Sequence, residues 1–404
     1  VPVIMDKNKN GTIEPGTDNV FLIFGMRRGG DNYYALDVTD KNTPHLQWIQ
    51  SRPQMGQSWS PPVVAKVDVT GVNNDKAVLI MGGGYDTTHD QPAMPLLPDN
   101  EGAGVFMLDL FSGAELWRAG IDPLADLTIG KMTRSIPSRI RVLDISGDGF
   151  ADRMYAVDVT GQLFRFDIKN GNSRLNLVDG GVVASMGAEG KLFPTAAETR
   201  RFYAAPDVSM FLDEAQNRRY LAISVGSGYR SHPLHKSAED RFYSYRDPDV
   251  FNQLSASDYL LYDVAYDDDF VEVQGKKEVT ISSSDRGWKF TLPPGEMILV
   301  ESQTFDDAVY FVSFQPQVAS IDPCQAGLSV NRLYKVAVRN GDPVVDLEGG
   351  IAPKPMFLFP SPDDPNCQGQ ECAPPPIGCV GVECFDPGYA NNPVRTLWTQ
   401  DGIN

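Results

Sequence analysis

Two short loops of the sequence place oxygen-bearing side chains at alternate positions around a glycine. In the first, DISGDGFAD, the glycine is Gly149, at the sixth position. A Ca²⁺ ion takes roughly 6–8 oxygen ligands, and a glycine at the sixth position of a calcium loop allows the sharp turn. Three carboxylates this close would repel one another without a cation. The spacing therefore predicts a calcium loop with the ligands Asp144, Ser146, Asp148, Phe150 (through its backbone carbonyl) and Asp152.

The second loop, DKNKNGTIE, repeats this arrangement near the start of the sequence. Its ligands would be Asp6, Asn8, Asn10, Thr12 and Glu14, with Gly11 at the sixth position. Neither loop is an EF-hand, because Thr17 and Tyr155 stand where an EF-hand needs a bidentate Glu. The alternative is a solvated turn, which Asp, Asn and Gly form without a metal. A third stretch, DVTGVNND at 68–75, looks like a degenerate copy that has lost the spacing.

The composition is that of a folded, acidic protein. The chain has 404 residues, 42% of them hydrophobic, and a formal net charge of -18. Such a charge repels phosphate backbones, so we expect no nucleic-acid partner, and it attracts cations. No apolar run reaches the roughly 18 residues that a membrane span needs. Because the sequence begins VPVIMDKNKN, without an initiator Met or a leader, we expect a segment of a longer protein.

A repeated strand pattern predicts the elements that must position these loops. The unit is an apolar strand, a Gly-rich turn and a second strand that ends in Asp. Copies lie at 20–40, 77–86 with 104–117, 153–171, 220–229 with 259–267, and 308–316 with 332–344. Sheets of about four short strands at such spacing indicate a β-propeller. We therefore expect an all-β, modified β-propeller of about seven irregular blades with long inserts over residues 1–348. The first strands of blades would lie in 58–71, 134–147 and 201–214, and a short helix near 233–257.

The end of the sequence differs in composition. Residues 349–393 are rich in Pro and hold four of the five cysteines, so we expect a strap or loop there, and a strand in 394–404 that closes the propeller. The spacing favours two local disulfides, Cys367–Cys372 and Cys379–Cys384, and leaves Cys324 over. Clustered cysteines of this kind indicate an oxidising compartment.

The sequence contains no local motif for catalysis. It lacks a P-loop, a G-x-S-x-G turn and a dinucleotide-binding fingerprint. His232 and His235 have metal-ligand spacing but no evident third ligand, so a polar loop is the favoured interpretation. Arg27 and Arg28 could clamp an anion, but in so acidic a chain we expect them to pair with carboxylates. We therefore predict a protein that is not an enzyme.

Several motifs together carry a family resemblance. They are GMRRGGDNYYALDVTD, GQSWSPPVV, DISGDGFADRMYAVDVTGQLFRFD, RRFYAAPDV, VGSGYRSHPL followed by EDRFY, and DRGWKF. In this order, over roughly residues 1–345, they resemble the C-terminal domain of the PilY family of type IV pilus biogenesis factors and tip adhesins. The family's calcium loop matches the 144–152 loop position by position, except that Ser146 replaces the usual Asp or Asn.

The resemblance implies a modified β-propeller on a larger secreted protein, whose preceding part would hold a von Willebrand A-like domain. It also implies a calcium loop that favours pilus extension over retraction, and roles in twitching motility and surface attachment. The implied partners are minor pilins or the pilus tip complex, and a host or abiotic surface. The implied location is the cell surface or the extracellular pilus tip, associated with the outer membrane and reached through the periplasm.

Two rival classes of function stand beside this resemblance. GVFMLDLFSGAELW is similar to the repeat of quinoprotein dehydrogenases, propellers that bind pyrroloquinoline quinone (PQQ). A passive carbohydrate-binding or scaffold propeller is the third class. The enzyme needs an adjacent Cys-Cys pair, which this sequence lacks, together with a catalytic Asp among Trp and Arg side chains.

Overall fold

A computed structural model describes most of the chain as two compact units. Unit 1 comprises Val1–Pro206 and Pro248–Asp269, and unit 2 comprises Asp207–Asp247 and the described residues from Phe270 onward. The structure describes residues 1–73, 76–91, 93, 97–189, 191, 193–213, 216–275, 281–282, 284–316, 329–337, 341–347, 351–359 and 376–387.

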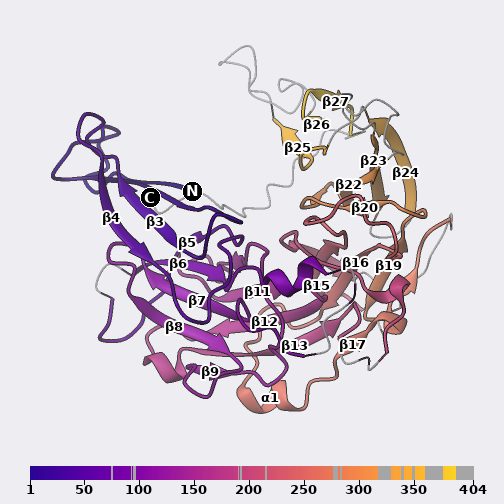
Figure 1. Cartoon of the computed structure of the whole chain (residues 1–404), viewed down its shortest axis with the longest axis horizontal. Helices are drawn as coiled ribbons and strands as arrows, with labels where there is room; N and C mark the ends of the chain where they lie inside the picture. The colour runs from indigo at the N-terminus through magenta and orange to yellow at the C-terminus, as the bar shows by residue number, and fades with distance from the viewer. Residues whose placement is uncertain are drawn as a thin grey trace. The chain divides into compact units, whose positions relative to one another are not determined.

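Unit 1 contains three consecutive sheets in which the strands follow chain order (Figure 1). The first is β1 (Pro2–Met5), β2 (Asn19–Gly25), β3 (Tyr33–Asp37) and β4 (His45–Gln50). The second is β5 (Val63–Lys66), β6 (Ala77–Gly82), β7 (Gly104–Asp109), β8 (Glu115–Gly120) and β9 (Leu127–Thr128). The third is β10 (Arg141–Leu143), β11 (Arg153–Val157), β12 (Gln162–Ile168), β13 (Val178–Ser185) and β17 (Ala265–Tyr266). Up to the fourth strand the pairing is antiparallel, whereas β9 and β17 pair in parallel at the edge.

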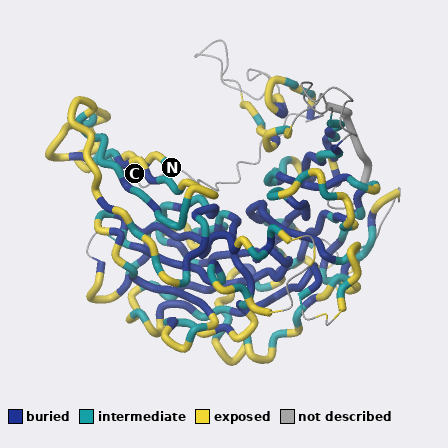
Figure 2. Tube along the Cα trace, in the orientation of Figure 1, coloured by how far each residue is buried: buried dark blue, intermediate teal, exposed yellow. Residues whose placement is uncertain are grey.

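The middle sheet of unit 1 is buried on both faces, as the dark strands of Figure 2 illustrate. Along β6, Ala77, Leu79 and Met81 pack into one core shared with the first sheet. The alternate residues Val78 and Ile80 pack into a second core shared with the third sheet. Successive strand residues point to opposite faces, so a strand buried on both faces is apolar throughout. This explains why the AVLIMG run shows no alternation of polar residues.

Unit 2 also contains three sheets among its described residues. The first is β14 (Asp207–Asp213), β15 (Arg218–Gly226), β16 (Arg241–Asp247), β19 (Gly287–Thr291) and β18 (Val271–Glu272). The second is β20 (Met297–Ile298), β22 (Ala308–Pro316), β23 (Ser329–Ala337) and β24 (Gly341–Leu347), with β21 (Gln303–Phe305) also paired to β22. The third is β25 (Met356–Leu358), β26 (Ile377–Val380) and β27 (Glu383–Phe385).

The all-β prediction is confirmed, and the expected first strands are in place. β5, β10 and β14 lie inside 58–71, 134–147 and 201–214 and begin their sheets. The described residues form six sheets, where the sequence suggested about seven blades. Within 349–393, where we expected a strap or loop, three short strands form a sheet. The expected closing strand at 394–404 lies outside the described residues.

Two local expectations held only in part. A short helix, α1, begins at the end of the region 233–257 where we expected one, but the middle of that region holds the strand β16, whose aromatic-rich sequence RFYSYRD favours extended structure. The strand placed at 259–267 instead holds the end of the short helix α1 (Ala256–Leu260) and the two residues of β17. Ser255 begins α1 because its side chain accepts a hydrogen bond from the Asp258 amide, and Asp258 bonds back to the Ser255 amide. This reciprocal capping stabilises a helix start.

Within the described residues, we find no helix with the length and apolar character needed to cross a bilayer.

Candidate metal centre

Both predicted calcium loops, and the degenerate third one, occupy the same place in the three sheets of unit 1. Each joins the first strand of a sheet to the second. The loop containing 6–14 joins β1 to β2, the turn containing 68–76 joins β5 to β6, and the 144–152 loop joins β10 to β11. The loops therefore belong to one repeated hairpin position of the fold.

The first carboxylate of the 144–152 loop is held by the two glycine amides. Asp144 accepts hydrogen bonds from Gly147 N at 2.6 Å and from Gly149 N at 2.8 Å. Gly149 has a φ of 88°, in the left-handed region that glycine adopts without a steric penalty. The fifth-position side chain also binds a backbone amide of the loop: Asp148 Oδ1 accepts a hydrogen bond from Phe150 N at 2.8 Å. The glycine at the sixth position thus has the turn-forming role that the sequence predicted.

The ninth position closes the loop. Asp152 Oδ2 accepts the amides of Ile145 and Ser146, each at 2.7 Å. The Asp152 amide donates to Leu143 O at 2.8 Å, and its carbonyl accepts from Ile168 N at 2.8 Å. Asp152 is therefore fixed through its backbone to both neighbouring strands, while its carboxylate holds the start of the loop.

The donor set of this loop suits a hard cation. Three carboxylates, one hydroxyl and one carbonyl are all oxygen donors, which Ca²⁺ prefers. A carboxylate offers about four lone-pair sites, so the amide hydrogen bonds leave acceptor capacity for an ion. In the part of the chain that the structure describes, no three His, Cys, Asp or Glu side chains are gathered closely enough to form a metal site. The calcium prediction therefore rests on the donor types, their spacing and the shared hairpin position.

The N-terminal loop repeats the hydrogen bonds of the 144–152 loop at equivalent positions. Its first-position carboxylate, Asp6, accepts the sixth-position amide of Gly11 at 2.7 Å. Its fifth-position side chain, Asn10 Oδ1, accepts the seventh-position amide of Thr12 at 2.8 Å. Gly11 has a φ of 78°, again left-handed. The two loops are thus built alike, as their common spacing suggested.

The N-terminal loop closes through a residue that the sequence analysis missed. Asp18 lies beyond the ninth position and is only 2% exposed. Its carboxylate accepts the Lys7 amide at 2.9 Å and the Glu14 amide at 2.8 Å. Asp18 therefore holds the second residue of this loop, as Asp152 does in the other loop. Glu14, at the ninth position, instead accepts the Asn8 side chain at 3.1 Å. No spacing rule in the sequence singles out Asp18.

A buried charge cluster anchors the strand that follows the 144–152 loop. Arg153, the residue directly after Asp152, is 1% exposed, and its Nε lies 2.7 Å from Asp167 Oδ1. Arg165 Nη2 lies 3.1 Å from Asp167 Oδ2. The two guanidinium groups also donate to backbone carbonyls in the segment 249–252. The carboxylate of Asp167 accepts in addition the Tyr259 hydroxyl at 2.7 Å. The cluster thus fastens the segment 249–259 to β11 and β12.

The arginines of GMRRGG pack beside an aromatic group. Arg28 forms a two-pronged ion pair with Asp90, at 2.7 and 2.8 Å, which confirms for this residue the predicted pairing with an acid. The guanidinium groups of Arg27 and Arg28 each lie 5.5 Å from the ring centre of Trp59. Trp59 in turn packs on Tyr85, with ring centres 4.8 Å apart. These contacts are of the cation–π and aromatic kinds that stabilise a folded surface.

A serine, a histidine and an aspartate also come together in unit 1, although no motif predicted them. His89 Nε2 lies 2.7 Å from Asp99 Oδ2, and the Ser135 amide donates to the same carboxylate at 2.7 Å. His89 and Ser135 are fully buried, as is the side chain of Asp99, and the Ser135 hydroxyl has no hydrogen-bond partner. A nucleophile needs its base within hydrogen-bond reach and access to substrate. The group therefore serves to join loops in the interior.

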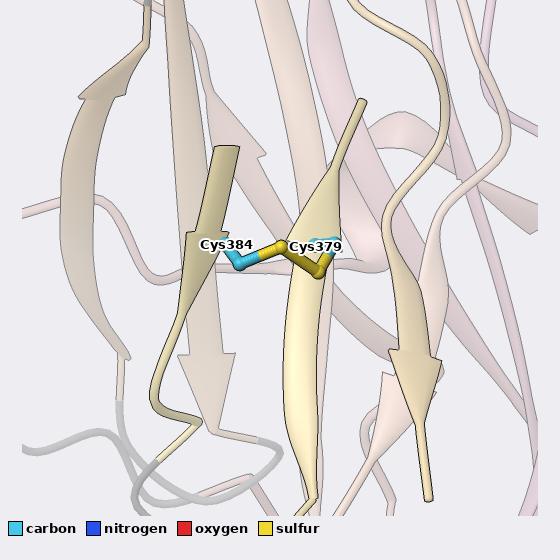
Figure 3. The surroundings of a disulfide bond; sticks show 2 residues. All are labelled: Cys379 and Cys384. Atoms are coloured by element: carbon cyan, nitrogen blue, oxygen red, sulfur yellow. A yellow bond between two sulfur atoms is a disulfide. The ribbon is translucent and has the colours of Figure 1, made fainter. Parts of the chain in front are cut away.

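One predicted disulfide is present. Cys379 and Cys384 face each other across β26 and β27, with Cα atoms 4.0 Å apart (Figure 3). This confirms the second of the two predicted pairings. Cys324, Cys367 and Cys372 lie outside the described residues.

No family model matches the chain. The type IV pilus biogenesis factor PilY1 of Pseudomonas aeruginosa strain PAO1 is 31% identical over 180 residues, which are 42% of this chain and 13% of that protein. PilY1 of strain UCBPP-PA14 is 26% identical over 224 residues, 55% of this chain and 17% of that protein. A PilY1 homologue of Xylella fastidiosa is 27% identical over 157 residues, 36% of this chain and 10% of that protein.

Among solved structures, the C-terminal domain of Pseudomonas aeruginosa PilY1 matches with a TM-score of 0.59 and 16% identity. The match covers 95% of this chain and 83% of that structure. A quinohemoprotein alcohol dehydrogenase from Comamonas testosteroni matches with a TM-score of only 0.38 and 9% identity, over 84% of this chain and 54% of that structure. A score that low carries no argument about activity.

These findings give first the class of protein, which is the β-propeller. The sequence similarity then indicates which members of that class the chain resembles. It is similar in sequence to PilY1 proteins and in fold to the C-terminal domain of PilY1. The matched region spans less than a fifth of each of these curated relatives.

Proposed function

We propose that this chain is the calcium-binding C-terminal domain of a type IV pilus biogenesis factor and tip adhesin. The relatives that match part of this chain are named type IV pilus biogenesis factors. In the proposal the protein works at the pilus tip or cell surface, with minor pilins of the tip complex and a host or abiotic surface as partners. It supports pilus extension against retraction, and with it twitching motility and attachment. The domain itself catalyses no reaction.

The observation that carries the calcium part of the proposal is the repeated loop construction. Two loops at the same hairpin position share their spacing, their left-handed glycine and two equivalent hydrogen bonds. Ca²⁺ would be held by Asp144, Asp148 and Asp152, with the Phe150 carbonyl and either Ser146 or a water. A bound ion would compensate the repulsion among the carboxylates. Its binding would thereby order one edge of the hairpin and leave the apolar cores unchanged.

The test uses the full-length protein in a piliated bacterium from which the native gene has been deleted. The number of surface pili and the extent of twitching motility are measured with and without added calcium, for wild type and Asp152→Ala. The turn residue Asp40 gives a matched control, Asp40→Ala, because its carboxylate caps a local turn, where it accepts the Asn42 amide at 2.9 Å and the Thr43 hydroxyl at 2.8 Å. We expect Asp152→Ala to lose the calcium response and Asp40→Ala to keep it. A normal calcium response in Asp152→Ala would contradict the proposal.

The quinoprotein alternative has its own test. The chain is incubated with PQQ and assayed for dye-linked alcohol oxidation, beside a heat-treated sample. We expect equal rates in the two samples. Oxidation well above the heated control would contradict the non-enzymatic proposal.

A further inference from the structure

The turn between β5 and β6 differs from its two counterparts in the charge at one position. When the three loops are aligned on their first Asp (Asp6, Asp68 and Asp144), the ninth position holds Glu14, Lys76 and Asp152 respectively. In the 68–76 turn, therefore, a cationic side chain stands where the other two loops have a carboxylate.

The ammonium group of Lys76 neutralises the first carboxylate of its own turn. Lys76 Nζ lies 2.7 Å from Asp68 Oδ2, and the two side chains are 39% and 30% exposed. The backbone of the turn is closed by a hydrogen bond from Val67 N to Lys76 O, at 2.9 Å. The positive charge that a metal ion would bring to such a loop is thus supplied by the chain itself.

Lys76 also contacts the neighbouring calcium loop. Its ammonium lies 5.5 Å from the ring centre of Phe150, the seventh residue of the 144–152 loop. The two hairpins are joined beside this contact by a hydrogen bond from Ala151 N to Lys66 O, at 2.9 Å. A cation over an aromatic face is attracted to it, so the Lys76 ammonium and the Phe150 ring attract each other. The same charge would repel a cation bound at the Phe150 carbonyl.

We propose that Lys76 is a positioning residue for the 144–152 loop, which it orders through Phe150 while its charge lowers the affinity of that loop for calcium. The Lys76 ammonium also supplies, beside Asp68, the positive charge that a metal ion would bring to this turn. The claim that Lys76 lowers the calcium affinity of the loop rests on the proposed calcium function. The claim that Lys76 orders the loop through Phe150 does not, because it applies to the metal-free chain.

The affinity test compares Lys76→Met with wild type by calcium titration of the whole chain. Met keeps an apolar stem on Phe150 and removes the charge. Two charges that lie within about one Debye length of each other (~10 Å at 0.1 M salt) still interact measurably. We therefore expect Lys76→Met to bind calcium roughly two- to fourfold more tightly than wild type at low salt. The gain should vanish in 1 M salt, where the Debye length falls to about 3 Å. Lys76→Arg should bind as wild type. Lys41→Met, at an exposed site in the turn between β3 and β4, changes the net charge equally and should have no effect.

The ordering test uses hydrogen exchange of the metal-free chain. Lys76→Ala removes both charge and stem, and we expect faster exchange of the amides of Phe150 and Ala151 than in wild type or Lys41→Ala. Unchanged exchange there would overturn the inference, whether or not calcium binds. Unchanged or weaker calcium affinity in Lys76→Met, or an equal gain in Lys41→Met, would overturn the affinity part. Failure of wild type to bind calcium would instead overturn the proposed function, and the exchange result would then decide on Lys76 alone.

Discussion

The charge cluster behind the 144–152 loop makes a strong prediction about Asp167. Its carboxylate is fully buried and pairs with Arg153 at 2.7 Å and with Arg165 at 3.1 Å. Asp167→Ala would leave two buried guanidinium groups without their anion. Breaking a buried ion pair by removing one partner typically costs about 3–5 kcal/mol, because a buried charge is left uncompensated. We expect the free energy of unfolding of unit 1 to fall by about this amount.

The repeat offers a matched control for this substitution. Asp109 stands at the corresponding place in the second sheet, in FMLD beside FRFD. Its carboxylate caps a turn, accepting the Ser112 amide at 2.8 Å and the Ser112 hydroxyl at 2.7 Å. Loss of a capping side chain costs about 1 kcal/mol, so Asp109→Ala should be the milder change by about 2–4 kcal/mol.

The assay combines urea unfolding with hydrogen exchange. Asp167 accepts the Leu254 amide at 3.0 Å and the Tyr259 hydroxyl at 2.7 Å, so the segment 249–259 should exchange faster in Asp167→Ala. Exchange in this segment should be unchanged in Asp109→Ala. Equal losses of stability in the two variants, or unchanged exchange of 249–259 in Asp167→Ala, would refute the anchoring role of the cluster.

Three further predictions concern pH, a disulfide and the loop glycine. Burial raises the pKa of Asp158 from 3.8 to about 7, with the neighbouring charge of Glu189 adding to the effect. The folded chain therefore keeps a proton that the unfolded chain loses, so the stabilisation is complete below pH 4 and is lost as the pH rises through 7. Asp158→Asn should flatten the decline in melting temperature between pH 4 and 7, and an unchanged slope would contradict this. Replacing Cys379 and Cys384 by Ser should cost less than about 3 kcal/mol, the value for a 15-residue loop, and urea unfolding of unit 2 would show a larger loss if the reasoning is wrong. Gly149→Ala should lower stability by roughly 1 kcal/mol through its left-handed backbone alone, since the added Cβ meets no atom within 4 Å; no loss in thermal unfolding would argue against the turn described here.

The parts of the fold that follow from local patterns were predictable from the sequence. Apolar strands ending in Asp, separated by Gly-rich turns, indicated the repeated sheets, and the first strands β5, β10 and β14 lie where expected. Because strands were predicted before and after residues 144–152, this loop was expected to join the two strands of a hairpin. The turn function of Gly149 followed from its place at the sixth position of the loop.

Features that depend on distant parts of the chain were not predictable. Arg153 and Asp167 lie in strands that read as ordinary repeats, and only the fold places the segment 249–259 against them. Asp18 closes the N-terminal loop from outside the alternating pattern. Lys76 stands at a ninth position that the sequence does show, but its contact with Phe150 requires two neighbouring hairpins to pack together. The strand and helix boundaries in 233–267 were misplaced because this insert and its two-residue edge strand β17 carry little periodicity.

The central claim is that the 144–152 loop binds calcium, and calorimetric titration tests it most directly. Wild type, Asp152→Ala and Asp6→Ala are titrated with calcium up to millimolar concentrations, because extracellular modules typically bind with a Kd of about 10⁻⁴–10⁻³ M. Asp6→Ala removes the first carboxylate of the N-terminal loop and leaves the 144–152 loop intact. We predict that Asp6→Ala retains the binding of one ion at the 144–152 loop and that Asp152→Ala loses it. Equal binding by wild type and Asp152→Ala, or no binding by either, would show that the loop is a turn without a metal.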